Sequence, residues 1–192
     1  MKQIKLFAAA AALTVFAGVA MADAPAPARA VTLSQFDGRW YEVARTPNRN
    51  QPNCTRLQID ITAAEGGAYN VVNTCSRSSG DPQVVRAEAT SLNGANNRLR
   101  FRARSGAAGV IGASQEFWVL DRAEDYSWAI LGTPGGNYFW LWTRSASPAN
   151  RAALLARVRA LGYNTAEAVQ IGGWEMQTLK IIWLTLSLGA AS

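Results

Sequence analysis

The stretch FDGRWYEVARTPN, residues 36–48, opens the first part of the chain that has a strong β pattern. Trp40 follows Gly38 by two positions, and apolar and polar residues alternate behind it. Such alternation is typical of a strand with one buried face and one solvated face. The pattern predicts a strand over 39–45 in which Glu42 shares the face of Trp40. Glu42 is therefore expected to be a buried acid that needs a partner, which the sequence does not identify.

Short runs of the same kind recur along the chain, separated by turn residues. The full set of expected strands is 39–45, 54–62, 68–76, 83–92, 98–105, 115–121, 126–132 and 138–144. Short strands at regular spacing with turn signals between them predict a barrel or a sandwich. No helix is expected before Ser147.

One helix is expected after the strands, over 148–161. Ser147 is a suitable N-cap, Pro148 suits the first helical position, and Gly162 suits the position after the C-cap. The apolar stripe that would pack this helix on the outside of the sheet consists of Leu154, Leu155, Val158 and Leu161. A last short strand is expected near 168–171.

Alternation also assigns faces within the strands. Leu57, Ile59 and Ile61 point to one side of their strand. In the run 98–104, one face carries Leu99, Phe101 and Ala103, and the other carries arginines at 98, 100, 102 and 104. We interpret this arginine row as a solvated outer face that also protects strand edges.

The first residues have the pattern of a secretory signal peptide. Lys2 and Lys5 precede an apolar core over 6–19, and residues 20–22 offer a small-x-small cleavage site. Cleavage after Ala22 would leave 170 residues and lower the formal net charge from +6 to +4. With no cysteine near this site to carry a lipid anchor, the protein is expected in the periplasm. An uncleaved anchor is the alternative.

Composition excludes several functions. The basic residues are scattered without a Lys/Arg run, which argues against nucleic-acid binding. The chain contains no histidine, which removes the Ser-His-Asp triad, the Cys-His pair and histidine ligation of zinc or haem. We expect no metal and no cofactor.

The two cysteines, Cys54 and Cys75, predict one disulfide in an exported chain. A turn centred near Glu65 and Gly66 would make 54–62 and 68–76 an antiparallel hairpin, with Cys54 directly opposite Cys75. A bridge that closes a loop of roughly 20 residues stabilises by about 3 kcal/mol.

Three motifs together resemble the lipocalin family, within it the bacterial and apolipoprotein-D-like branch. The first is Gly38-Arg39-Trp40, continuing to Arg45. The second, Leu120–Tyr126, lies at the turn between the sixth and seventh expected strands, and the third is Phe139–Arg144, before the helix. The resemblance covers about 31–171.

The resemblance implies an all-β fold, an eight-stranded antiparallel up-and-down β-barrel (a calyx) with one C-terminal α-helix packed outside. It gives structural roles to Gly38, Trp40, Asp121, Tyr126 and Arg144, with Trp40 closing one end of the barrel and Arg144 against its indole. It also implies that the loops 46–53, 77–82, 105–114 and 132–137 ring the open mouth, where the disulfide would brace the rim.

An eight-stranded barrel has room for one small ligand. The resemblance and strand alternation together predict an apolar calyx formed by Tyr138, Trp140, Trp142, Phe117, Val119, Ala129, Leu131, Leu99 and Phe101. Such a lining suits a lipid chain or a flat ring, and Tyr138 would hydrogen-bond a head group near the mouth. The alternative is a filled core without a cavity.

The leading hypothesis is therefore a periplasmic, non-enzymatic carrier of a small apolar ligand such as a fatty acid or lysophospholipid. One alternative is a protein-binding barrel, such as a protease inhibitor that uses the flexible arm 23–30. Another is a lipocalin-type enzyme that uses Glu42. The apolar tail 172–192 has no assigned role; a covering strand, a homodimer contact, a membrane-surface contact and an altered reading frame are its alternatives.

Overall fold

The computed structural model describes residues 25–27, 29–49, 51 and 53–172. The expected signal peptide over 1–22 and nearly all of the apolar tail lie outside the described residues. Within the described part of the chain, no helix is long and apolar enough to cross a membrane.

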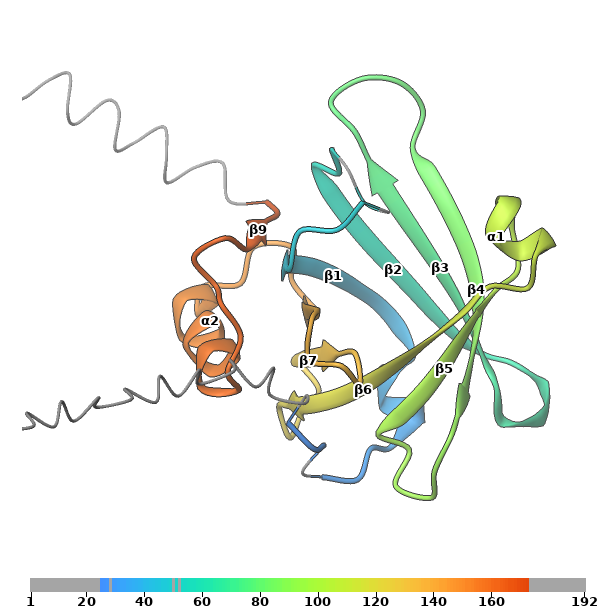
Figure 1. The fold of residues 1–192 in the computed structure, drawn as a ribbon, viewed down its shortest axis with the longest axis horizontal. Coiled ribbons are helices and arrows are strands. Elements are labelled where there is room, and N and C mark those ends of the chain that lie inside the picture. The colour runs from blue at the N-terminus through green and yellow to red at the C-terminus, as the bar shows by residue number, and fades with distance from the viewer. Residues whose placement is uncertain (1–24, 28, 50, 52, 173–192) are drawn as a thin grey trace, which may run out of the picture.

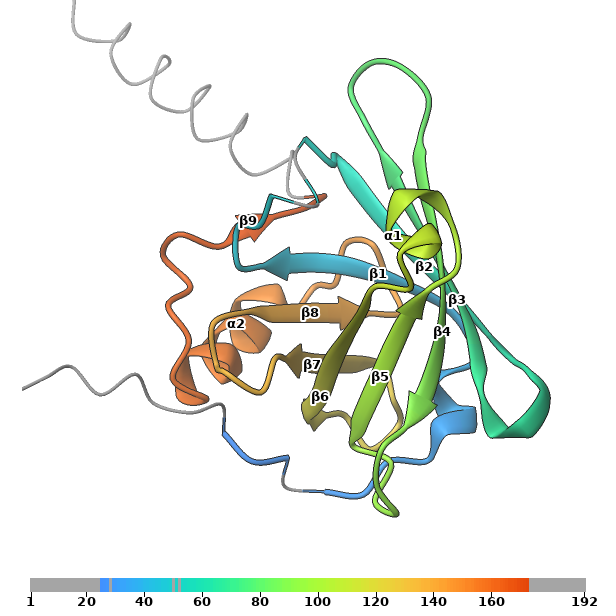
Figure 2. The same cartoon turned by 45° about the vertical axis from the view of Figure 1, so that its right-hand side comes forward.

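Eight antiparallel strands close into a barrel, as predicted (Figures 1 and 2). Each strand pairs with its neighbour in the sequence, and the first and last close the ring. The barrel strands are β1 (Gly38–Arg45), β2 (Arg56–Ala63), β3 (Tyr69–Ser76), β4 (Gln83–Ser91), β5 (Arg98–Ala103), β6 (Ser114–Arg122), β7 (Trp128–Gly132) and β8 (Phe139–Thr143). A ninth strand, β9 (Val169–Gln170), pairs with the last two residues of β1.

Among the described residues, four helical segments accompany the strands. The longest is α2 (Arg151–Ala160), and α1 (Gly106–Val110) lies between β5 and β6. The short 3-10 helices are η1 (Leu33–Phe36), just before β1, and η2 (Glu65–Gly67), in the turn between β2 and β3.

Two predictions for the chain before α2, the start of β7 and the absence of a helix, were wrong. The strand expected over 126–132 begins at Trp128, because Tyr126 lies in the turn with a left-handed φ of 54°. The helix α1 was not expected, since five residues are too few to show helical periodicity. Gly109 permits it, because a Cβ there would lie 2.8 Å from the carbonyl carbon of Arg104.

The predicted start of the C-terminal helix was wrong by three residues. The N-cap is Asn150 and not Ser147, whose hydroxyl donates to the Gly172 carbonyl at 3.5 Å. Pro148 lies in the preceding turn, where its carbonyl accepts from the Arg151 amide at 3.3 Å. Gly162, at φ 93°, follows the C-cap as predicted.

The barrel wall separates two hydrophobic cores. The inner core fills the lower barrel and includes Trp40, Ile59 and Leu131. The outer core lies between α2 and the outside of β1 and β6–β8, and the predicted stripe of Leu154, Leu155 and Val158 is buried in it. All five residues of β8 are buried, because α2 covers the face that points away from the barrel interior.

Trp40 and Arg144 close one end of the barrel. The Arg144 guanidinium lies 3.9 Å from the Trp40 ring centroid, as predicted. It also donates to the carbonyls of Gln35 at 2.6 Å and Arg39 at 3.0 Å. Gly38, at φ 92°, leaves room for this cation, since a Cβ there would lie 3.6 Å from Arg144 Nη1.

The segment before η1 runs across the same closed end. Arg29 pairs with Asp121 at 2.9 Å and with Glu124, and the Val31 amide donates to the Ala95 carbonyl at 2.8 Å. The Asn97 side chain, which is buried, donates to the Arg29 carbonyl at 2.9 Å. These contacts connect the N-terminal segment to the turns β4–β5 and β6–β7.

We predict that Trp40→Ala lowers the free energy of unfolding by about 3–5 kcal/mol, because it removes a fully buried indole and the ring beneath Arg144. Urea denaturation followed by circular dichroism measures this. Trp128→Ala, on the outer wall, is the matched control and should cost less. Equal losses in the two variants would contradict a special role for the closed end.

Candidate functional site

A cavity of about 1010 Å³ occupies the open half of the barrel. The strands that line it are β1–β6 and β8, and the loop after β1 contributes Pro47, Asn48, Arg49 and Gln51. The full lining is Glu42, Pro47, Asn48, Arg49, Gln51, Leu57, Asn73, Cys75, Gln83, Val85, Phe101, Gln115, Phe117, Tyr138, Trp140 and Trp142. The calyx is therefore hollow, and the alternative of a filled barrel is wrong for this half.

One wall of the cavity is a chain of aromatic rings. The ring centroids of Phe101 and Phe117 lie 4.7 Å apart, and those of Phe117 and Trp140 lie 4.9 Å apart. Tyr138 continues the chain toward solvent, with its centroid 6.0 Å from that of Trp140. The first two contacts are edge-to-face and the third is stacked, and both kinds hold the rings in preferred orientations, so the wall is preformed.

The structure places the nine predicted calyx residues at three depths. Five of them line the large cavity, namely Phe101, Phe117, Tyr138, Trp140 and Trp142. Leu99 and Leu131 lie deeper, around a second cavity of about 20 Å³. Val119 and Ala129 belong to the inner core and line neither cavity. Alternation and the family resemblance together predicted the inward direction of these side chains, but not how far up the barrel the packed core extends.

Three polar strand residues that line the cavity were missed by the sequence reasoning. Asn73 on β3, Gln83 on β4 and Gln115 on β6 line the cavity beside Leu57 and Val85. Asn73 has the same parity as the buried Val71 and Cys75, so alternation alone was sufficient to find it. Because Asn73 is polar, it was not expected at an interior position of the barrel.

A β-bulge at Val43 directs the side chains of Glu42 and Arg45 into the wall of the cavity. The pairing of β1 with β8 shifts between Glu42 and Ala44, so Val43 is an extra residue. Val43 and Ala44 both pack in the outer core, and the side chain of Arg45 reaches Glu42. Arg45 Nη1 lies 2.8 Å from Glu42 Oε1, and only 3% and 1% of the two side chains are exposed. Arg45 is the partner of Glu42 that the sequence did not identify.

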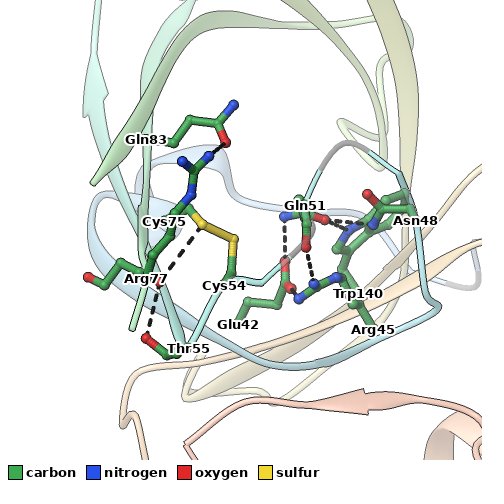
Figure 3. Close-up of a disulfide and its surroundings, with 11 residues drawn as sticks. Glu42, Arg45, Asn48, Gln51, Cys54, Thr55, Cys75, Arg77, Gln83 and Trp140 are labelled. Atoms are coloured by element: carbon green, nitrogen blue, oxygen red, sulfur yellow. Dashed lines mark hydrogen bonds and ion pairs between the residues drawn. A yellow bond between two sulfur atoms is a disulfide. The ribbon is translucent and has the colours of Figure 1, made fainter. Parts of the chain in front are cut away.

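Gln51 connects this pair to the mouth loop (Figure 3). Its carbonyl accepts from Arg45 Nη2 at 2.6 Å, and its side-chain amide donates to Glu42 Oε2 at 3.3 Å. Its side-chain oxygen accepts from Asn48 at 2.7 Å and from the Trp140 indole at 3.3 Å. Through Gln51, the loop after β1 is bonded both to the buried ion pair and to the aromatic wall.

Burial raises the pKa of Glu42 to about 7, although the charge of Arg45 and the hydrogen bonds from Arg45 and Gln51 favour the ionised form. The ordinary value is 4.5, so the folded protein takes up a proton between these two pH values. The stabilisation by this proton is complete below about pH 4.5 and is lost as the pH rises through about 7.

We predict that the wild type loses up to about 3 kcal/mol of stability relative to Glu42→Gln as the pH rises across this interval. Glutamine keeps the shape of the protonated acid but does not titrate. Urea denaturation of both proteins at several pH values measures the difference. Glu65→Gln, at an exposed acid, should retain the pH dependence of the wild type. Parallel curves for wild type and Glu42→Gln would contradict the assignment.

The predicted disulfide joins Cys54 and Cys75, with Cα atoms 5.3 Å apart (Figure 3). The predicted register of the hairpin was wrong, since Leu57 and not Cys54 lies opposite Cys75. The turn includes η2 and is centred on Gly66, which displaces the pairing. Cys54 precedes β2 and reaches Cys75 beside Thr55, whose amide donates to the Ser76 carbonyl at 2.8 Å.

We predict that the double variant Cys54→Ser, Cys75→Ser loses about 3 kcal/mol of stability, because the bridge closes a loop with a sequence separation of 21. Thermal unfolding of the oxidised wild type and the variant measures this. Reductant should lower the stability of the wild type to that of the variant and leave the variant unchanged. A loss on adding reductant to the variant would show that the effect is not from this bridge.

The closed barrel with one floor and a hollow, ring-lined upper half defines a class of protein, the β-barrel calyx. Residues 31–171 match the family described as "Lipocalin-like domain", and the chain belongs to the lipocalin family. Lipocalins bind small hydrophobic ligands and are generally non-enzymatic carriers.

Two relatives are similar to this chain at modest identity. "Temperature-induced lipocalin-1" of Arabidopsis thaliana is 25% identical over 122 residues, which are 62% of this chain and 65% of the plant protein. The match therefore spans slightly less than two-thirds of that relative's length. "Outer membrane lipoprotein Blc" of Vibrio cholerae is 26% identical over 129 residues, which are 65% of this chain and 71% of the relative.

Solved structures show the same fold at lower identity. Insecticyanin from the tobacco hornworm Manduca sexta superimposes with a TM-score of 0.61 at 16% identity, over 79% of this chain and 86% of that chain. Apocrustacyanin C2 superimposes with a TM-score of 0.57 at 14% identity, over 78% of this chain and 89% of that chain. These similarities confirm the barrel with its outer helix.

Proposed function

We propose that this protein is a periplasmic carrier that binds one fatty acid or lysophospholipid in its calyx. The observation that carries the proposal is the cavity of about 1010 Å³, which has an aromatic wall and opens at one end only. In this arrangement the alkyl chain lies along Phe117 and Trp140, and the head group stays at the mouth.

The size of the apolar contact supports a useful affinity. Transferring roughly 300 Å² of alkyl surface from water at about 25 cal/mol per Å² contributes about 7–8 kcal/mol before association costs. Because the aromatic wall is preformed, little additional ordering of side chains opposes binding. Before association costs, this energy would correspond to a dissociation constant of about 1–10 μM, which is the tightest binding that the alkyl contact alone can provide.

The mouth offers groups for a polar head. Arg49 is exposed at the rim and lines the cavity, so its guanidinium can pair with a carboxylate or phosphate. Tyr138, 37% exposed, lies at the same end and provides a hydroxyl. Glu42 lies deeper and is already paired with Arg45, so its carboxylate does not repel an anionic head group at the mouth.

Export to the periplasm is supported by two features of the chain and one of a relative. The first 22 residues have the pattern of a signal peptide, and a disulfide such as Cys54–Cys75 persists in oxidising compartments. The Vibrio cholerae relative is named as an outer membrane lipoprotein, which is also an envelope protein.

We predict that Trp140→Ala weakens binding of a long-chain fatty acid by about tenfold or more, because it removes the central ring of the wall. Isothermal titration calorimetry with a fatty acid and with lysophosphatidylcholine measures this, after lipid has been extracted from the purified protein. Trp118→Ala is the matched control, since that indole packs on the outer side of the wall under Arg98.

A delipidated wild-type protein that binds neither ligand, with no lipid in the extract, would overturn the proposal. Equal weakening by Trp140→Ala and Trp118→Ala would place the binding site outside the calyx.

A further inference from the structure

Two aliphatic side chains project into solvent at the end of α1. Val110 is 89% exposed and Ile111 is 79% exposed, whereas the other large exposed hydrophobic residues, Val84, Leu92 and Tyr138, are 36–39% exposed. Folding in water does not favour such exposure, and the two adjacent side chains form a small contiguous apolar surface at the end of α1. We call Val110 and Ile111 the aliphatic tip.

The aliphatic tip lies at the mouth of the calyx. It belongs to the connection that leaves β5 after Phe101 and enters β6 before Gln115, and both of these residues line the cavity. Figures 1 and 2 show α1 at the end of the barrel opposite the β4–β5 turn. Leu92 lies in that opposite turn, so it is an exposed aliphatic residue at the closed end.

Arginines surround the base of the tip. A Cβ at Gly112 would lie 3.5 Å from Arg102 Nη2, so this guanidinium lies beside Gly112, the residue that follows Ile111. The Arg86 carbonyl accepts from the Arg104 amide at 2.7 Å, and its own amide donates to the Ser105 hydroxyl at 2.9 Å. Arg104 is paired with Glu88 at 2.6 Å, but Arg86 and Arg102 make no ion pair with any described residue.

Apolar side chains flanked by unpaired cations fit a lipid surface that carries anionic head groups. The aliphatic side chains enter the boundary of the acyl chains while the arginines remain among the head groups. A stable protein partner requires a broader surface, about 800 Å² on each side, and two side chains on a short turn provide far less. The arginine row of β5 does not line the cavity. On such a lipid surface, the end of the row nearest the mouth would contact the head groups.

We propose that the aliphatic tip and Arg86 and Arg102 dock this protein on an anionic lipid surface, with the mouth of the calyx turned toward the lipid. The docking does not require that the calyx hold a lipid, so its test is independent of the test of the proposed function. Its consequence for a lipid carrier is a short path between the membrane and the cavity.

The test is sedimentation of the full-length protein with vesicles of phosphatidylcholine alone or mixed with phosphatidylglycerol. We expect binding to the mixed vesicles that decreases with added salt. The double variant Val110→Ser, Ile111→Ser should reduce the partition coefficient by about tenfold or more. Arg86→Ser with Arg102→Ser should reduce binding to mixed vesicles by about tenfold and remove most of its salt dependence.

Leu92→Ser is the matched control and should bind vesicles like the wild type. Because every variant keeps the same terminal segments, any membrane affinity of 173–192 is common to all of them. The tip variant should also retain the calorimetric affinity for fatty acid, since neither residue lines the cavity.

Three outcomes would overturn the proposal. They are no sedimentation of the wild type with the mixed vesicles, wild-type binding by the tip variant, and equal loss in Leu92→Ser. Concentration-dependent self-association that the tip variant abolishes, without vesicle binding, would instead assign the tip to a contact between two copies of the chain.

Discussion

The rest of the structure depends on the contact between the Arg144 guanidinium and the Trp40 indole. This one cation lies over the ring at 3.9 Å and donates to carbonyls of η1 and β1, so it joins the end of β8 to the start of the barrel. The Trp40 indole donates to the Phe36 carbonyl at 2.8 Å, which fixes η1 beneath the barrel. Because this end of the barrel is closed and packed, the apolar side chains at the bottom are buried. The upper half can then remain hollow without loss of the fold.

A second constraint determines the polar side of the cavity. The extra residue at Val43 reverses the alternation of β1, so two successive residues pack outside under α2 and the chain then returns a charged group to the interior. The resulting pair of Glu42 and Arg45 is almost completely buried, and each partner is satisfied chiefly by the other and by Gln51. A buried pair of this kind contributes little net stability compared with apolar packing. Its effect here is geometric, because it holds the mouth loop against the aromatic wall.

Much of the fold was predictable because alternation is a local property. The eight strands, the shared faces of the calyx side chains and the packing of the helix through Leu154 and Val158 follow from periodicity in short windows. Which face points inward followed from the resemblance to the lipocalins. The errors occurred where a local pattern was extended over a connection. The turn at η2 is centred on Gly66, so the hairpin register is shifted by three residues from the prediction. The Ser147 hydroxyl donates to the Gly172 carbonyl and does not cap α2. Arg45 was missed because a bulge is created by pairing with β8, a strand almost a hundred residues away.

The sequence by itself determined the class of fold, the family and the disulfide partners, because each depends on residue types at fixed positions along the chain. Only the tertiary structure decided where the packed core ends and the cavity begins, and that Val119 and Ala129 lie below the cavity. It alone brought Glu42, Arg45 and Gln51 together and left Val110 and Ile111 exposed beside unpaired arginines. The physical reason is that burial and ion pairing depend on strands distant in the sequence, whereas alternation records only which way each side chain points.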